Sequence, residues 1–208
     1  MNFYYMAYRD QLVPTGELSN VGYPIMTNVP SSYRTGVEIT ASVRATKKIN
    51  LAGNLTLSRN IIRDFTEYYV DYNSTTFEEE YKSRFLGDVN IAYSPGVVAA
   101  SDISYMPVGG MEIHLISKYV GYQYFDNTSN AVRSLDPYFV NNLRIDHEFK
   151  LKKGTLIGAQ LQVNNLFNSM YVSNAYGGNW YTDGVEYSWA GYFPQAGINY
   201  LARLFVRF

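Results

Sequence analysis

Apolar and polar residues alternate along most of this chain, and this alternation constrains the fold more than any other feature of the sequence. Successive side chains of a β-strand point to opposite faces, so a period of two predicts strands with one apolar and one polar face. We find no credible helix of any length. In the clearest segment, Thr155–Asn165, one face carries Ile157, Ala159, Leu161 and Val163, and the other carries Gly158, Gln160, Gln162 and Asn164.

Eight segments of this kind follow one another along the chain, and most of them are about 10 residues long. A tilted strand needs ~9–11 residues to cross a bilayer. Short turns are expected at Thr46–Lys48, Pro107–Gly110 and Lys152–Gly154, whereas the connections at the other strand ends are long, polar and aromatic. The eight segments are 2–13, 35–45, 51–61, 97–105, 111–118, 139–150, 155–165 and 198–208, and the long connections are 14–33, 64–96, 124–137 and 166–197.

Alternation alone also fits a soluble lipocalin-like barrel or a β-sandwich whose apolar face points inward. Strand length, the separation of short from long connections, and small residues on the apolar face favour a membrane barrel with its apolar face on lipid. Aromatic residues near the strand ends predict two girdles at headgroup depth. The first girdle contains Phe149, Tyr105 and Phe208, and the second contains Tyr119, Tyr122, Tyr124, Phe125, Tyr138 and Phe139.

Composition excludes several other classes. With 17 Lys and Arg against 18 Asp and Glu, the net charge of -1 gives no basic stripe for nucleic acid. The chain has no Cys and only 2 His, so neither a disulfide framework nor a multi-histidine metal centre is expected. No apolar run approaches the ~20 residues of a membrane-spanning helix. The N-terminus lacks the features of a signal peptide, so an exported form is expected to be mature or a fragment.

Catalysis has little support in the sequence. His114 with Ser117 or Glu112 is the only nearby set that a hydrolase could use, and Ser117 has the opposite strand parity. His114 is therefore expected to be a polar residue of the lumen face, and we expect neither an enzyme nor a cofactor. Charges of both signs on that face are expected to pair across strands, with Arg144, Asp146 and Glu148 as the residues most worth testing.

Several strings of residues resemble TonB-dependent outer-membrane receptors, particularly those of the Bacteroidetes type. The C-terminal string YFPQAGINYLARLFVRF, Tyr192–Phe208, is similar to the end of these proteins. QLQVNNLFNSMY, Gln160–Tyr171, resembles their penultimate strand and last long loop. YVGYQYFDNTSN, Tyr119–Asn130, and YMAYRDQLVPTGELSNVG, Tyr5–Gly22, are similar to earlier parts of the same barrels, and the order of the strings agrees.

The resemblance implies a 22-stranded barrel in a bacterial outer membrane, closed by a plug domain that is absent from residues 1–208. It implies import of a scarce nutrient, namely siderophore iron, haem, cobalamin or a glycan, with energy relayed by the TonB complex through the plug. Residues 1–208 would then be the C-terminal segment of the barrel, in contact with lipid and with the plug. A self-contained eight-stranded anchoring or adhesion protein is the first alternative, and a soluble ligand-binding barrel is the second.

The resemblance also implies roles for particular residues. The lumen residues Arg144, Asp146 and Glu148 would meet the plug. The last strand would be read by the barrel-assembly machinery through Tyr200, Leu204, Val206 and Phe208. Ligand capture would fall to aromatic loop residues, because flat rings bind with little loss of side-chain entropy, although packing within the loops is an equal alternative for them. These aromatic residues are Tyr124, Phe125, Trp180, Tyr181 and Trp189.

Overall fold

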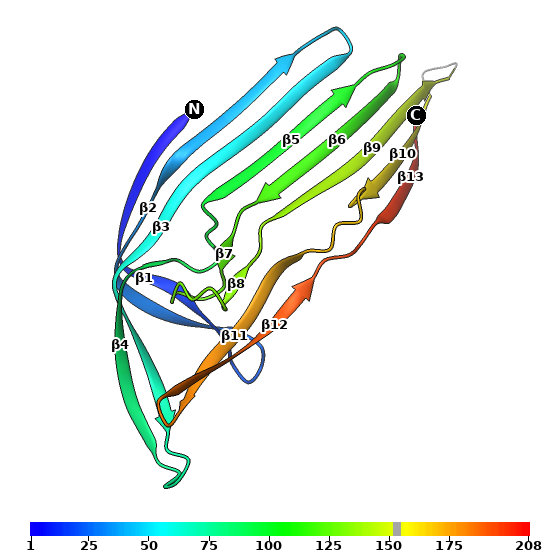
Figure 1. Ribbon diagram of the computed structural model, residues 1–208. Coiled ribbons are helices and arrows are strands. Elements are labelled where there is room, and N and C mark those ends of the chain that lie inside the picture. Colours follow the sequence, from blue (N-terminus) through cyan, green and yellow to red (C-terminus); the bar gives the residue numbers. More distant parts are fainter. Residues whose placement is uncertain (152–154) are drawn as a thin grey trace.

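The computed structural model describes residues 1–151 and 155–208, and they form a largely antiparallel β-structure without helices (Figure 1). None of the described segments is a helix long and apolar enough to cross a membrane. The strands are β1 Asn2–Leu18, β2 Pro24–Arg44, β3 Ile49–Tyr72, β4 Glu79–Asn90, β5 Val97–Tyr105, β6 Met111–Val120, β7 Gln123–Tyr124, β8 Ser134–Leu135, β9 Tyr138–Lys150, β10 Leu156–Asn164, β11 Val172–Thr182, β12 Val185–Pro194 and β13 Asn199–Arg207.

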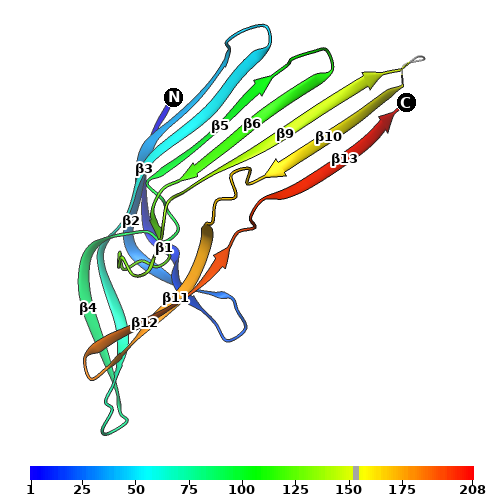
Figure 2. The same cartoon turned by 45° about the vertical axis from the view of Figure 1, so that its right-hand side comes forward.

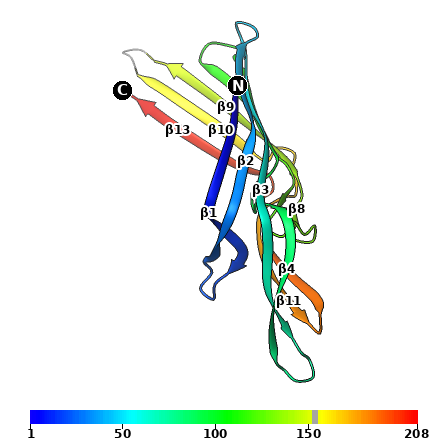
Figure 3. The ribbon, with the colours of Figure 1, turned by 90° about the vertical axis from the view of Figure 1, so that its left-hand side faces the viewer.

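The main sheet follows the order β1-β2-β3-β5-β6-β9-β10-β13, and each of these eight strands overlaps one of the eight predicted segments, although β1, β2 and β3 are longer than predicted. The sheet is curved and open, as Figure 3 shows, and β1 and β13 stand at its two ends. Within the described residues β1 pairs only with β2, and β13 only with β10. The prediction of an up-and-down antiparallel barrel wall is therefore confirmed, and each end of the wall presents a free strand edge.

Register across the sheet separates apolar from polar side chains row by row. One row of paired residues is apolar through seven strands, and the neighbouring row, one residue along, is polar until its last member. The apolar row is Val43, Leu51, Ile103, Leu115, Leu143, Val163 and Tyr200, and the polar row is Arg44, Asn50, Ser104, His114, Arg144, Gln162 and Leu201. Paired residues share a face, so the wall has one apolar and one polar surface.

The apolar surface is not a protein core. Leu161 is 43% exposed, and its neighbours Ile157 and Val206 are 37% and 52% exposed. Soluble monomers rarely expose a contiguous apolar surface larger than a few hundred Å². The buried cores lie instead among the long hairpins: one contains Val13, Val29, Ile62, Val89 and Ile91, and the other contains Phe125, Leu135 and Ala175.

The connections differ from the prediction at one end of the wall. The short turns at Thr46–Lys48 and Pro107–Gly110 are present, whereas Lys152–Gly154 lies outside the described residues. The segments 14–33, 64–96 and 166–197, predicted as long connections, contain paired strand (Figure 2). The reason is that backbone groups of long extended segments need partners, and hairpin pairing supplies them.

Aromatic rings cover glycines on opposite strands at three places in the sheet. Phe205 pairs with Gly158, Tyr4 with Gly36, and Tyr176 with Gly191, and in each pair the ring occupies the space of the missing Cβ. Phe205 points to the polar face, where the guanidinium carbons of Arg203 and Arg207 lie 5.2 Å and 5.9 Å from its ring centre. The glycine therefore gives an aromatic ring a place on a polar surface.

We predict that Gly158→Leu destabilises the wall by about 1–3 kcal/mol, because the new side chain and the Phe205 ring would claim the same volume. The measurement is the free energy of unfolding from urea titration of the protein refolded in detergent micelles. Gly109→Ala is the control, because a Cβ at Gly109 has no neighbour within 4 Å. Equal stability of the two variants would show that the ring does not need the glycine.

Candidate functional site

Two long hairpins, β3–β4 and β11–β12, dock on each other at the end of the wall away from the short turns (Figure 2). The strands β11 and β3 pair in parallel at Tyr181 with Asp71 and Thr182 with Tyr72. The carboxylate of Asp183 accepts hydrogen bonds from the Ser74 backbone N–H, at 3.1 Å, and from the Ser74 hydroxyl, at 2.5 Å. We call this contact between the hairpin tips the hairpin clasp.

Asp71 holds the clasp from its other side. Its carboxylate accepts a hydrogen bond from the Gly184 backbone N–H at 3.1 Å and forms an ion pair with Lys82 at 2.8 Å. The hydrogen bond from Lys82 holds the pKa of Asp71 below its usual value, and the hydrogen bonds from Ser74 do the same for Asp183. Because both carboxylates bind a proton less readily in the folded state, they stabilise the clasp at pH values above the ordinary Asp pKa of ~3.9. This contribution is lost as the pH falls through the lowered pKa values.

A buried charge network lies next to the clasp. Arg133, only 2% exposed, places Nε 3.0 Å from Asp126 and Nη2 3.2 Å from Glu186. Arg84 contacts Glu67 at 2.7 Å and Glu186 at 3.4 Å, and the amide of Asn179 donates to both glutamates. Ion pairs thus link β3, β4, β12 and the 124–137 segment to one another.

Burial sets the ionisation of two groups in this region. It raises the pKa of Asp126 above its usual value, and the nearby Arg133 opposes that rise. Burial also raises the pKa of Tyr181 to about 12, so its hydroxyl stays protonated at neutral pH. The Tyr181 ring packs 3.9 Å from that of Tyr69, between ring centres. Arg133, Glu67 and Asp126 thus form the buried part of the network, whereas the Arg84 and Glu186 side chains are 40% and 25% exposed.

A cavity of about 420 Å³ opens between the hairpins, and we call it the hairpin cavity. This volume lies in the range of ~300–1,000 Å³ that is typical of small-molecule sites. Its wall combines apolar and polar groups from β1, β2, β3, the 124–137 segment and β11. Its lining includes Thr27, Asn28, Val29, Asp64, Phe65, Thr66, Glu67, Tyr68, Asp126, Arg133 and Asn179.

The five aromatic residues predicted for ligand capture do not form one site. Phe125 is fully buried against Leu135 and Ala175, so it belongs to neither a ligand surface nor the predicted girdle. Tyr181 is 5% exposed within the clasp region, and Tyr124 lies against Tyr122. Trp180 and Trp189 are 43% and 45% exposed on one face of the β11–β12 hairpin, against Tyr187 and Tyr176.

Sequence reasoning missed the residues of the clasp and the charge network. One signal was present: Asp183-Gly184 between apolar alternating segments is typical of a two-residue hairpin turn. Both residues have positive φ, 52° and 77°, and Thr182 pairs directly with Val185. No sequence signal connects Glu67 with Arg133 or Glu186, because they come together only when the hairpins dock.

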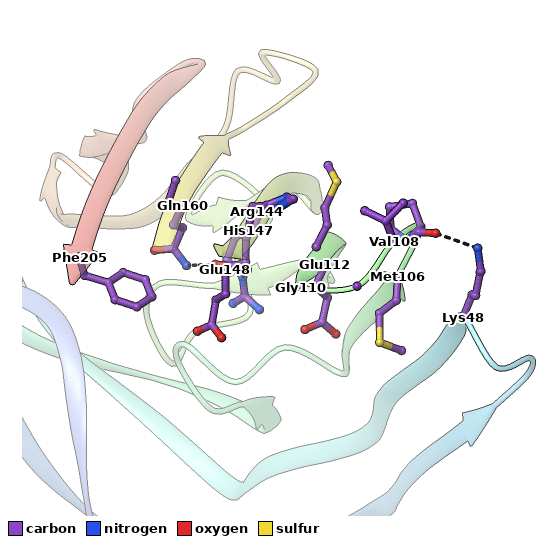
Figure 4. A pocket seen from close by; sticks show the side chains of 15 residues that line it. Lys48, Met106, Val108, Gly110, Glu112, Arg144, His147, Glu148, Gln160 and Phe205 are labelled. Carbon is purple, nitrogen blue, oxygen red and sulfur yellow. Dashed lines mark hydrogen bonds and ion pairs between the residues drawn. The ribbon is translucent and has the colours of Figure 1, made fainter. Parts of the chain in front are cut away.

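A second hollow, of about 840 Å³, lies on the wall at the short-turn end (Figure 4). Of the residues predicted to face a plug, Arg144 and Asp146 pair with each other at 2.9 Å, and Gln160 donates to Asp146 at 2.6 Å. The side chain of Glu148 is exposed and makes no ion pair with any described residue. Figure 4 shows Glu112, Arg144 and Glu148 together in this hollow.

The structure places His114 and Ser117 on opposite faces of the wall. His114 Nδ1 lies 2.8 Å from Asp102, and its Nε2 lies 3.4 Å from Glu112. Ser117 bonds instead to Asn141, whose row belongs to the opposite face. No group of three His, Asp or Glu side chains among the described residues could hold a metal ion.

The residues predicted as an assembly signal lie along the free edge strand β13. Tyr200, Leu204 and Val206 share the apolar face and are 68%, 82% and 52% exposed. Phe208 follows the strand and is fully exposed. Their recognition by an assembly machinery stays a prediction.

No protein-family model matches the sequence, and no match was found among curated proteins. Among solved structures, the fold is similar to the siderophore receptor PiuA from Acinetobacter baumannii, with a TM-score of 0.63 and 15% identity over 99% of this chain and 25% of that one. The ferric-catecholate import receptor Fiu from K12 E. coli gives 0.59 and 14% over 98% and 24%. The copper transporter OprC gives 0.60 and 17% over 99% and 28%. The chain thus spans about a quarter of these receptors and shares the fold of part of their barrels.

We predict that Arg133→Met opens the docked hairpins, because Asp126 and Glu186 would lose a buried cationic partner. Breaking a buried ion pair costs about 3–5 kcal/mol, so hydrogen exchange of the β11 backbone amides should become much faster. Arg63→Met is the control, because Arg63 is exposed and its guanidinium lies only over the ring of Tyr33. Unchanged exchange in the Arg133 variant would mean that the network does not hold the hairpins together.

Proposed function

We propose that this chain is the C-terminal barrel segment of an outer-membrane receptor that imports a scarce nutrient. The observation that carries the proposal is the exposed apolar face that continues across the wall, row by row. Hydrocarbon is the environment in which such a face is stable. Short turns at one end and long docked hairpins at the other fit periplasmic turns and extracellular loops.

The free edges of the wall support a larger barrel. Unpaired N–H and C=O groups along β1 and β13 would each cost several kcal/mol in hydrocarbon, where water cannot satisfy them. Further strands of the same receptor would pair with these edges, and a 22-stranded barrel with a plug domain is the arrangement we propose. The chain's similarity to about a quarter of each receptor of known structure supports this reading.

The proposal includes partners and a location. The receptor would lie in the outer membrane, take energy from the TonB complex through its plug, and be inserted by the barrel-assembly machinery. The resemblance of Tyr192–Phe208 to Bacteroidetes receptors suggests that type. Siderophore iron, haem, cobalamin and a glycan are the nutrients to consider.

Two alternatives remain distinct in their consequences. A self-contained eight-stranded protein would pair β1 with β13, and this chain, refolded alone in detergent, would then show heat-modifiable migration on a gel. A soluble barrel would bury its apolar face, whereas Tyr200 and Leu204 are 68% and 82% exposed here. A lipid-facing wall should also aggregate in water without detergent.

The proposed orientation predicts opposite results for neighbouring residues of β10. Leu161→Arg should destabilise the receptor by about 2–4 kcal/mol in a bilayer, because it places a charge on the lipid face. Gln160→Arg lies on the polar face and should have little effect. Unfolding free energies of both variants in lipid vesicles give the comparison, and a greater loss for Gln160→Arg would reverse the assignment of the two faces.

The proposed plug contact predicts a transport defect without an assembly defect. Replacing Arg144, Asp146 and Glu148 together by Ala in the complete receptor should reduce energy-dependent uptake several-fold while the amount of folded barrel stays unchanged. Lys47→Ala, in a short turn, is the control. Uptake at the unmodified rate would count against a plug-facing role for these residues.

A further inference from the structure

We propose that the hairpin cavity binds an uncharged, hydroxyl-rich ligand, of which a short oligosaccharide is the simplest form. This inference rests on the proposed function, because it names the class of nutrient that the receptor would capture. It follows from the charges, the free hydrogen-bonding groups and the rings that line the cavity.

The cavity offers no cation to an anionic ligand. Arg133 is the only Lys or Arg side chain in its described lining, and Asp126 and Glu186 already engage its guanidinium. Arg84, which is not part of the described lining, pairs with Glu67 and Glu186. An anion entering the cavity would therefore find no cation free to pair with it, and the carboxylates of Asp64, Glu67 and Asp126 would lie nearby.

A cationic ligand is also a poor match. The two buried carboxylates of the lining, Glu67 and Asp126, are each paired with a guanidinium, so their charge is largely balanced. Asp64 is the only remaining lining carboxylate, and it is exposed, where water weakens its attraction for a cation. A cation in the cavity would therefore gain only a weak, water-screened attraction from Asp64.

The groups left free for a ligand are neutral and can both donate and accept. Among the described residues, nothing donates to the side-chain carbonyl of Asn179, whose amide N–H groups point to Glu67 and Glu186. The hydroxyls of Thr27 and Thr66 likewise have no hydrogen bond within the described chain. Hydroxyls of a sugar match such groups, because each can donate and accept in turn.

Rings and aliphatic groups complete the cavity. Phe65 and Tyr68 come from the same stretch of β3, and Val29 is buried beside them. Tyr68 is 81% exposed, so it borders the cavity without being enclosed in it, and its ring can reach a ligand only at the cavity's edge. Aromatic rings supply broad apolar contact at low entropic cost, and this suits the apolar face of a sugar ring.

The hairpin clasp holds these groups in place before a ligand arrives. Glu67 and Asn179 belong to the charge network that joins β3 to β11, and Asp71 and Asp183 fix the hairpin tips. A neutral ligand gains little from long-range attraction, so its affinity depends on preformed hydrogen-bond geometry. The rigid frame therefore suits a ligand that is held by hydrogen bonds and not by ion pairs.

The test uses the complete receptor that contains this chain, purified in detergent, and isothermal titration with defined probes. The neutral probes are maltotriose, cellotriose, mannotriose and xylotriose, the anion is a ferric tris-catecholate complex, and the cation is spermidine. We expect at least one trisaccharide to bind, and Tyr68→Ala to weaken that binding at least tenfold. Tyr81→Ala is the matched control, because Tyr81 is 79% exposed on the same hairpin but lies outside the cavity.

The inference is overturned if no trisaccharide binds, if Tyr81→Ala weakens binding as much as Tyr68→Ala, or if the ferric complex or spermidine binds with an affinity that depends on Tyr68.

Uptake by cells that carry the receptor separates this inference from the proposed function. Energy-dependent uptake of the ferric complex, without trisaccharide binding, would overturn the inference and leave the proposed function standing. In a further outcome, the receptor binds a trisaccharide through Tyr68 and takes up neither that trisaccharide nor the ferric complex. This result would support the cavity assignment and count against a transport role.

Discussion

Backbone hydrogen bonding between neighbouring strands is the constraint on which the rest of this structure depends. An apolar environment supplies no water to satisfy N–H and C=O groups, so a wall that carries lipid on one side must pair them internally. The register from β1 to β13 does so, and it also sorts side chains into apolar and polar rows. The same pairing therefore satisfies the backbone and creates two surfaces of different chemistry.

Strand β3 links the wall to the hairpins that carry the cavity. Its 24 residues, Ile49–Tyr72, span roughly 80 Å, whereas about 10 residues are enough to cross a bilayer. The first half pairs with β2 and β5 in the wall, and the second half pairs with β4 and, at Asp71 and Tyr72, with β11. Because the strand is continuous, the position of the cavity is fixed by the wall.

Local pattern predicted the wall but not the site. The period of two in Thr155–Asn165 and its equivalents depends only on nearby residues, so all eight wall strands could be found. The continuation of β3 beyond Ile61 was missed, although Asp183-Gly184 did signal the other hairpin. Phe125 was predicted for ligand capture, but it is buried in the structure. Its burial depends on packing against Leu135 and Ala175, which the local sequence pattern does not show. Glu67 and Arg133 meet through docking, which no local pattern records.

Internal charge pairing occurs both in the hairpins and on the polar face of the wall. In the hairpins, Arg133 and Arg84 are held by carboxylates, and on the wall Arg144 pairs with Asp146 while His114 lies beside Asp102. A charged side chain that already forms an ion pair with a neighbour attracts an ion from solution only weakly. Together with a net charge of -1, this leaves little field to steer a charged solute. In the proposed receptor, selection would therefore depend on the positions of hydrogen-bonding groups and rings, and the docked hairpins fix these positions.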